Sequence, residues 1–270
     1  MKNKIILCIA VIAIIVGIIV AINLNTKEEE NSLERILSKG EFILGLDDSF
    51  PPMGFRNEDN EIVGFDIDVA KEVCNRLEVE LVLQPISWTA KEQELNSYNI
   101  DCIWNGMSID DDRKEKMSLS MAYLENSMSF TVKAESSIST LDNLKGKKIG
   151  VQSGSTAEKI LQESQLYTEL DEIVSYSDNI TAFMDLEINQ IDAVFLDDVV
   201  ANYYISSNNK KYKVLNEALQ EEEYAIGFRK QDTELCNKVN EILLEMKKDG
   251  SLAQISTKWF GKDVTIINAK

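Results

Sequence analysis

Short apolar strands alternate with amphipathic helices from residue 42 onward, and this alternation restricts the possible folds more than any other feature of the sequence. Strands are predicted at 42–46, 81–84, 101–104, 147–152, 172–176, 192–197 and 224–230. Helices fill the intervals, and Asp66 is expected to cap the first, which carries apolar residues at helical spacing from Ala70 to Leu77. Strands that alternate with helices form mainly parallel sheets flanked by helices, and such sheets bind ligands beyond the carboxyl ends of their strands. We therefore predict an α/β protein of two lobes, divided near residue 130.

The N-terminus predicts export. Lys2 and Lys4 precede an uncharged apolar run, residues 5–22, which is long enough to span a membrane. A secretory signal has a shorter apolar core and a cleavage site of the form small-x-small, which this run lacks. We therefore predict a membrane anchor at 1–23 and a solvated tether at 24–32, with a cleaved signal as the alternative. The lysines stay inside, so the rest of the chain is expected at the outer face of the cytoplasmic membrane, or secreted if the signal is cleaved.

Charge and composition exclude several classes of protein. The chain has 28 Lys and Arg against 46 Asp and Glu, a net charge of −18, which argues against nucleic acid as a partner. It has no histidine, which excludes Ser-His-Asp and Cys-His catalysis and most zinc sites. The four cysteines are scattered singletons and are interpreted as small buried apolar residues, although a disulfide between two of them stays open. No cofactor and no metal are expected.

Five segments in a fixed order carry a resemblance to a known family. They are SFPPMGFRNEDNEIVGFDIDVAKEV (49–73), IDCIWNGMSIDDDRKEKMSLS (100–120), LKGKKIGVQSGSTAE (144–158), QIDAVFLDD (190–198) and KDGSLAQISTKWFG (248–261). Together they resemble the polar amino-acid solute-binding proteins of family 3, which have the type II periplasmic-binding-protein fold and serve ABC importers. The resemblance implies a discontinuous first lobe (33–129 and 226–264) and a second lobe (130–225). It also implies two extended crossovers that act as a hinge, near 129–133 and 223–228.

A free amino acid presents a carboxylate, and the resemblance assigns residues to it from both lobes. Arg113 corresponds to the arginine that holds this carboxylate, a role that suits its planar fork of paired donors. Outside the motif, Arg113 would be interpreted as a surface arginine paired with the neighbouring aspartates. Ser108 would add a hydroxyl or a backbone N–H. Ser155 and Thr156 open a helix, where they would offer N–H groups and a hydroxyl to the carboxylate, serve as a plain cap, or do both.

The ammonium and the side chain of the ligand are assigned in the same way. Asp197, at the end of a strand, corresponds to the acid that pairs with the ammonium; the adjacent Asp198 and a helix-capping role are the alternatives. Phe50 and Trp88 correspond to two rings that enclose the ligand side chain, although core packing would explain either ring alone. Gly106 lies where the backbone must approach the ligand closely.

The sequence departs from the family pattern around the ligand side chain. Many members have a tyrosine where this chain has Phe50, and hydroxyl residues where it has Asn105 and Gly106. Asn105 is expected to contribute an amide instead. A cationic ligand would need an acidic partner, which Asp47 or Asp48 could supply. A neutral polar amino acid, such as glutamine or a cystine-like compound, is favoured.

The resemblance predicts a monomeric solute-binding protein that is not an enzyme and that hands an amino acid to an ABC importer permease. A dehydratase on the same fold is one alternative, and without histidine it would depend on a carboxylate such as Glu158. A sensory ligand-binding domain is the other; it would add a transmitter region, which we do not expect here.

Overall fold

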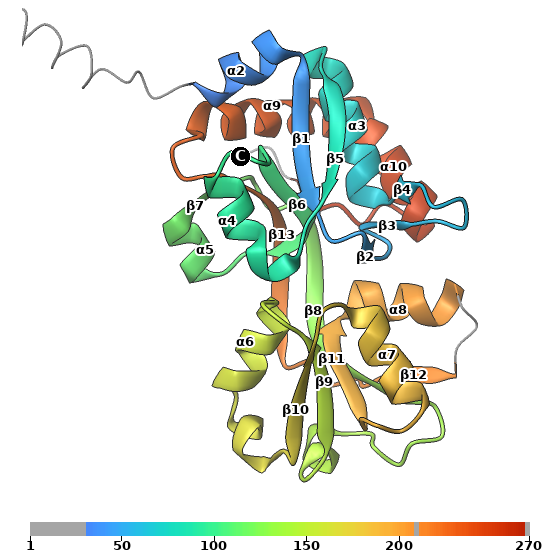
Figure 1. The fold of residues 1–270 in the computed structure, drawn as a ribbon. Coiled ribbons are helices and arrows are strands. Elements are labelled where there is room, and N and C mark those ends of the chain that lie inside the picture. The colour runs from blue at the N-terminus through green and yellow to red at the C-terminus, as the bar shows by residue number, and fades with distance from the viewer. Residues whose placement is uncertain (1–30, 208–210, 268–270) are drawn as a thin grey trace, which may run out of the picture.

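The fold of this chain consists of two α/β lobes connected by two long strands. A computed structural model describes residues 31–207 and 211–267 (Figure 1). The elements of the first lobe that precede the crossing are α2 (Ser32–Lys39), β1 (Glu41–Leu46), β2 (Ser49–Phe50), β3 (Gly54–Arg56), β4 (Ile62–Val63), α3 (Phe65–Leu77), β5 (Glu80–Pro85), α4 (Lys91–Asn96), β6 (Cys102–Ser108), α5 (Asp111–Lys116) and β7 (Met117–Leu119). A 3-10 turn, η1 (Trp88–Ala90), precedes α4. The two-lobed architecture predicted from the sequence is confirmed.

The second lobe repeats the pattern before the chain returns. Its elements are η2 (Leu141–Leu144), β9 (Lys148–Gln152), α6 (Thr156–Glu163), η3 (Gln165–Glu169), β10 (Glu172–Tyr176), α7 (Asn179–Glu187), β11 (Ala193–Asp197), α8 (Asp198–Ser207) and β12 (Tyr212–Val214). The chain then re-enters the first lobe and ends in α9 (Thr233–Asp249) and α10 (Ser251–Phe260), which lie beside α3 and α2 (Figure 1).

The connecting strands are β8 (Leu124–Lys133) and β13 (Gln220–Arg229), and they hydrogen-bond to each other between the lobes. Their mutual pairing runs from Leu124 opposite Tyr224 to Met128 opposite Gln220. On one side β13 pairs antiparallel with β6, and on the other β8 pairs antiparallel with β11. One sheet path, β10-β9-β11-β8-β13-β6-β1-β5, therefore passes through both lobes. The mutual pairing begins earlier in both strands than the crossovers expected at 129–133 and 223–228.

The prediction that Asp66 caps α3 is wrong. The cap position is Gly64, and Asp66 lies inside the first turn with its side chain fully buried. Its carboxylate accepts hydrogen bonds from the Gly106 N–H (2.7 Å) and the Tyr123 hydroxyl (3.0 Å). Local sequence made Asp66 resemble a cap, but its partners come from other parts of the chain.

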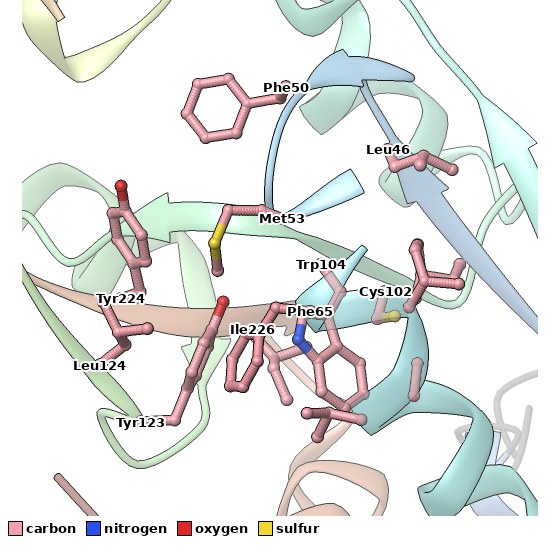
Figure 2. Packing of buried hydrophobic residues seen from close by; sticks show 14 of the residues in the cluster. Leu46, Phe50, Met53, Phe65, Cys102, Trp104, Tyr123, Leu124, Tyr224 and Ile226 are labelled. Carbon is pink, nitrogen blue, oxygen red and sulfur yellow. The ribbon is translucent and has the colours of Figure 1, made fainter. Parts of the chain in front are cut away.

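Lobe 1 has a core of aromatic and aliphatic side chains between its sheet and α3, α9 and α10. Figure 2 shows part of it: Trp104 and Phe65 lie deep in the cluster, whereas the Phe50 ring stands at its edge. Cys74, Cys102 and Cys236 are buried and free, as the interpretation of the cysteines predicted.

A buried arginine joins several elements of this lobe. Arg229 has no exposed surface, and its guanidinium donates to the backbone carbonyls of Leu95 (3.0 Å) and Ile100 (2.7 Å). It forms ion pairs with Asp232 (2.6 Å) and Asp101 (3.5 Å). These contacts connect the end of β13 to the end of α4, the start of β6 and the entry to α9.

The predicted membrane anchor, 1–23, lies outside the described residues, as does most of the tether. Within 31–207 and 211–267, no helix combines the length and apolar character needed to cross a bilayer.

Candidate ligand-binding site

A small cavity lies between the two lobes. Its lining residues are Asp47, Phe50, Trp88, Asn105, Gly106, Ser108, Arg113, Met128, Gln152, Ser155, Thr156 and Asp197. The nine residues that the sequence singled out all belong to this lining. The structure brings them together, and their role in binding a ligand stays a prediction.

Arg113 supplies a buried positive charge to the cavity. It lies in α5, where the side chain of Asp110 caps the helix by accepting from the Arg113 N–H (2.7 Å). One guanidinium nitrogen donates to the Ser108 carbonyl (2.6 Å), so the strand end at Ser108 orients the arginine. Burial lowers the pKa of Arg113, while Asp110 and more distant carboxylates oppose the shift. The guanidinium is therefore a cation that an anion in the cavity would stabilise.

Asp197 supplies a buried carboxyl group from the other lobe. It ends β11, and its Oδ1 accepts from the Tyr224 hydroxyl (2.5 Å) and the Asn126 amide (2.9 Å). Burial raises the pKa of Asp197 to about 7. A cation in the cavity would favour the ionised form. Of the two neighbouring aspartates, Asp197 lines the cavity and Asp198 does not. Their roles stay predictions.

The start of α6 faces the same cavity. The Ser155 hydroxyl accepts from the Glu158 N–H (3.1 Å) and donates to the Gln152 carbonyl (2.7 Å), so it acts as the helix cap. The Thr156 hydroxyl is buried and has no hydrogen-bond partner among the described residues. A buried hydroxyl in that state favours a ligand that can pair with it.

The lobes touch each other at this cleft. Lys91, which sequence reasoning did not identify, is buried and donates to the carbonyls of Trp88 (3.1 Å) and Gly154 (3.0 Å). Its ammonium lies 5.0 Å from the centre of the Trp88 ring, and burial lowers its pKa to about 8. Because Gly154 precedes α6 in lobe 2, this contact spans the cleft. The structure therefore has its lobes closed.

Asp47, Gln152 and Met128 complete the lining and were not among the site residues expected from the sequence. From the sequence, Asp47 and Asp48 are expected only as alternative partners for a cationic ligand. Asp48 instead pairs with Arg56 (2.6 Å) and does not line the cavity. The one available signal for Asp47 and Gln152 was position, because both stand at the carboxyl ends of predicted parallel strands.

Gly106 is held in a conformation that suits glycine. Its φ is +57°, and an added Cβ would lie 2.9 Å from the Phe50 ring, 3.1 Å from Met53 and 3.2 Å from the Tyr224 ring. The buried Asp66 accepts the Gly106 N–H and so fixes the backbone at this point. This region of the cavity wall therefore has no room for a side chain.

We expect Gly106→Ala to lower the free energy of unfolding by about 2–3 kcal/mol, because it combines a left-handed alanine with overpacking. The corresponding fall in Tm is roughly 5–10 °C by calorimetry. Gly146→Ala is the matched control, since its φ is +70° but nothing lies within 4 Å of an added Cβ. That control should cost only about 1 kcal/mol. Equal losses in the two variants would show that the contacts of Gly106 contribute nothing.

Glu158, the candidate acid of a dehydratase, lies elsewhere. The Glu158 carboxylate accepts from the Gly154 N–H (2.8 Å) and the Ser175 hydroxyl (2.7 Å) and does not line the cavity. The carboxylate that a dehydratase would need as its acid or base is therefore hydrogen-bonded within lobe 2, away from the cavity. Across 31–207 and 211–267, no cluster of three or more acidic or cysteine side chains could hold a metal ion.

Comparison with known proteins identifies a family that this chain resembles over most of its length. Residues 42–262 match the family described as bacterial extracellular solute-binding proteins, family 3. The L-cystine-binding protein TcyJ of Escherichia coli (strain K12) is 32% identical over 252 residues, which is 93% of this chain and 94% of that protein. The histidine-binding periplasmic protein of the same organism is 31% identical over 229 residues, or 82% of this chain and 88% of that protein.

A solved structure agrees as well. An ABC uptake transporter substrate-binding protein from Streptococcus pneumoniae with bound histidine is 36% identical, with a TM-score of 0.86. The match covers 88% of this chain and 100% of that one. These relatives are transport binding proteins, so the chain is not an enzyme. It belongs to the bacterial extracellular solute-binding proteins, family 3.

Proposed function

We propose that this protein captures a free amino acid with a polar or cystine-like side chain and delivers it to an ABC importer. The observation that carries this proposal is the placement of Arg113 and Asp197, a buried guanidinium and a buried carboxyl group from different lobes, on one cavity. A free amino acid carries the complementary pair of charges on one carbon atom.

The lining divides into three polar groups that correspond to the three parts of a polar amino acid. Arg113 and the unpartnered Thr156 hydroxyl suit a carboxylate. Asp197 suits an ammonium. The third group contains Asp47 and Gln152, which are hydrogen-bonded to each other and suit a polar side chain. Phe50 and Trp88 add apolar walls, which suit the carbon chain between the polar ends.

The mechanism is closure of the two lobes about the connecting strands. The division that we propose is lobe 1 at 33–129 and 226–264, and lobe 2 at 130–225. Arg113 and the two rings belong to the first, and Thr156 and Asp197 to the second. A ligand that contacts both lobes stabilises the closed state, because its affinity for that state is higher. The importer permease would then recognise the closed surface.

We further propose that the protein acts as a monomer at the outer face of the cytoplasmic membrane, held by the apolar segment 5–22. The length of that segment and the absence of a small-x-small site support an anchor over a cleaved signal.

A screen of the twenty amino acids and cystine by thermal shift, followed by calorimetry, tests the function. At a hundredfold excess over Kd, a true ligand stabilises the folded state by about 2.7 kcal/mol. For a chain of this size the rise in Tm is roughly 5–10 °C. The α-amide of the same amino acid is the control and should give a much smaller shift, since it cannot form an ion pair with Arg113. If no amino acid shifts the melt, the proposal fails.

A further inference from the structure

The carboxylate of Asp47 is buried and already hydrogen-bonded. It follows β1 in lobe 1, with 8% of its surface exposed. Its Oδ1 accepts from the backbone N–H (2.9 Å) and the hydroxyl (2.5 Å) of Ser49, and its Oδ2 accepts from the Gln152 amide (2.6 Å). Three of the roughly four acceptor positions of a carboxylate are therefore filled by the protein itself.

The donor on Oδ2 comes from the opposite lobe. Gln152 is the last residue of β9, with 3% of its surface exposed. Its Nε2 also donates to the Ser177 carbonyl (3.2 Å), and its Oε1 accepts from the Asn179 amide (3.4 Å). These contacts orient the amide, so that its donor points across the cleft at Asp47 instead of turning away.

The hydrogen bonds to Asp47 change which ligand side chains its carboxylate favours. A buried carboxylate without donors would require a cationic ligand side chain, because an unpaired charge in such a place is costly. Burial does raise the pKa of Asp47, while the hydrogen bonds from Ser49 and Gln152 oppose that shift. A neutral side chain therefore leaves no orphaned charge behind. A cationic side chain gains less than it would from a free carboxylate.

We propose that Gln152 determines the specificity of this site by occupying Asp47, so that amino acids with neutral, hydrogen-bonding side chains are preferred over cationic ones. The inference rests on the proposed function and adds the ligand class. Gln152 acts through Asp47 and is therefore a positioning residue.

Gln152→Leu tests the inference in the full-length chain, because leucine has a similar size but no donor. We expect the ratio of affinities for arginine and glutamine, measured by calorimetry, to move at least tenfold toward arginine. Gln190→Leu, an exposed glutamine in the same lobe, is the control and should leave the ratio unchanged. Adding Asp47→Asn to Gln152→Leu should abolish the gain for arginine, since the unpaired charge is then gone.

One further measurement and one further variant distinguish this role from a purely structural one. Carboxyl NMR titration should show a higher pKa for Asp47 in Gln152→Leu than in the wild type, because a lowering hydrogen bond is lost. Gln152→Glu provides a second variant if the leucine protein folds poorly; its added carboxylate should also favour arginine.

The outcomes are distinguishable. If the wild type binds no amino acid, the proposed function and this inference are both overturned. If the wild type binds an amino acid but Gln152→Leu changes neither the affinity ratio nor the pKa of Asp47, only this inference is overturned.

Discussion

Replacing Arg113 with alanine is expected to weaken amino-acid binding by a factor of about 30 to several thousand, as measured by calorimetry. The ligand carboxylate would enter a buried cavity without its cation, and truncating one partner of such a pair costs about 2–5 kcal/mol. The thermal melt should change by less than about 3 °C. The guanidinium donates one short hydrogen bond, to the Ser108 carbonyl, and its ion pair with Asp110 is long, at 3.9 Å.

Arg56→Ala provides the matched control for this prediction. Arg56 lies in the same lobe and also pairs with an aspartate, but its side chain is 40% exposed and does not line the cavity. Its loss should leave affinity within about twofold of the wild type, as expected of a surface ion pair. An affinity of Arg113→Ala within about fivefold of the wild type would contradict the role of Arg113 in the site.

Substitution of Arg229, the other buried arginine, is expected to lower stability and to leave ligand affinity nearly unchanged. We expect Arg229→Met to lower the free energy of unfolding by about 3–5 kcal/mol, because Asp101 and Asp232 would lose a buried partner. The carbonyls of Leu95 and Ile100 would lose their donor as well. The melt, followed by calorimetry, should fall by about 10 °C or more.

Ligand affinity distinguishes the effect of replacing Arg229 from that of replacing Arg113. The part of the Arg229→Met protein that remains folded should bind its amino acid with nearly the wild-type affinity, because Arg229 does not line the cavity. The exposed Arg56→Met should change the melt by less than about 2 °C. A melt of Arg229→Met equal to that of the wild type would show that the buried ion pairs contribute no net stability.

Periodicity predicted the elements because that information is local. The helix expected to open at Ser155 and Thr156 is α6, which begins at Thr156 with Ser155 as its cap. The spacing of apolar residues specifies such an element without reference to the rest of the chain. The grouping of Arg113 with Asp197 is a different case, since 84 positions separate them and periodicity alone gives no contact between them. It followed from the resemblance.

The failures have a shared physical cause. Asp66 has the composition of a cap, and only its burial against Gly106 shows its real partners. Arg229 stands at the end of a strand, where an arginine is normally solvated. Gln152 and Asp47 are 105 positions apart, and nothing in either neighbourhood indicates the other. A polar side chain in a core is explained by its partners, and those are set by tertiary structure.

In the proposed closure, the ladder between β8 and β13 would act as the axis of rotation. Ser108 pairs with Tyr224 and Asp197 pairs with Met128, so the residues proposed to hold the carboxylate and the ammonium of the ligand would lie next to that axis. Side chains near an axis of rotation move little when the two lobes open. The Gln152–Asp47 and Lys91–Gly154 contacts are not attached to this ladder and would separate first. The carboxylate and ammonium of an arriving amino acid would thus be bound before its side chain contacts the cavity. A ligand with an unsuitable side chain would be rejected late, because the two lobes would fail to close on it.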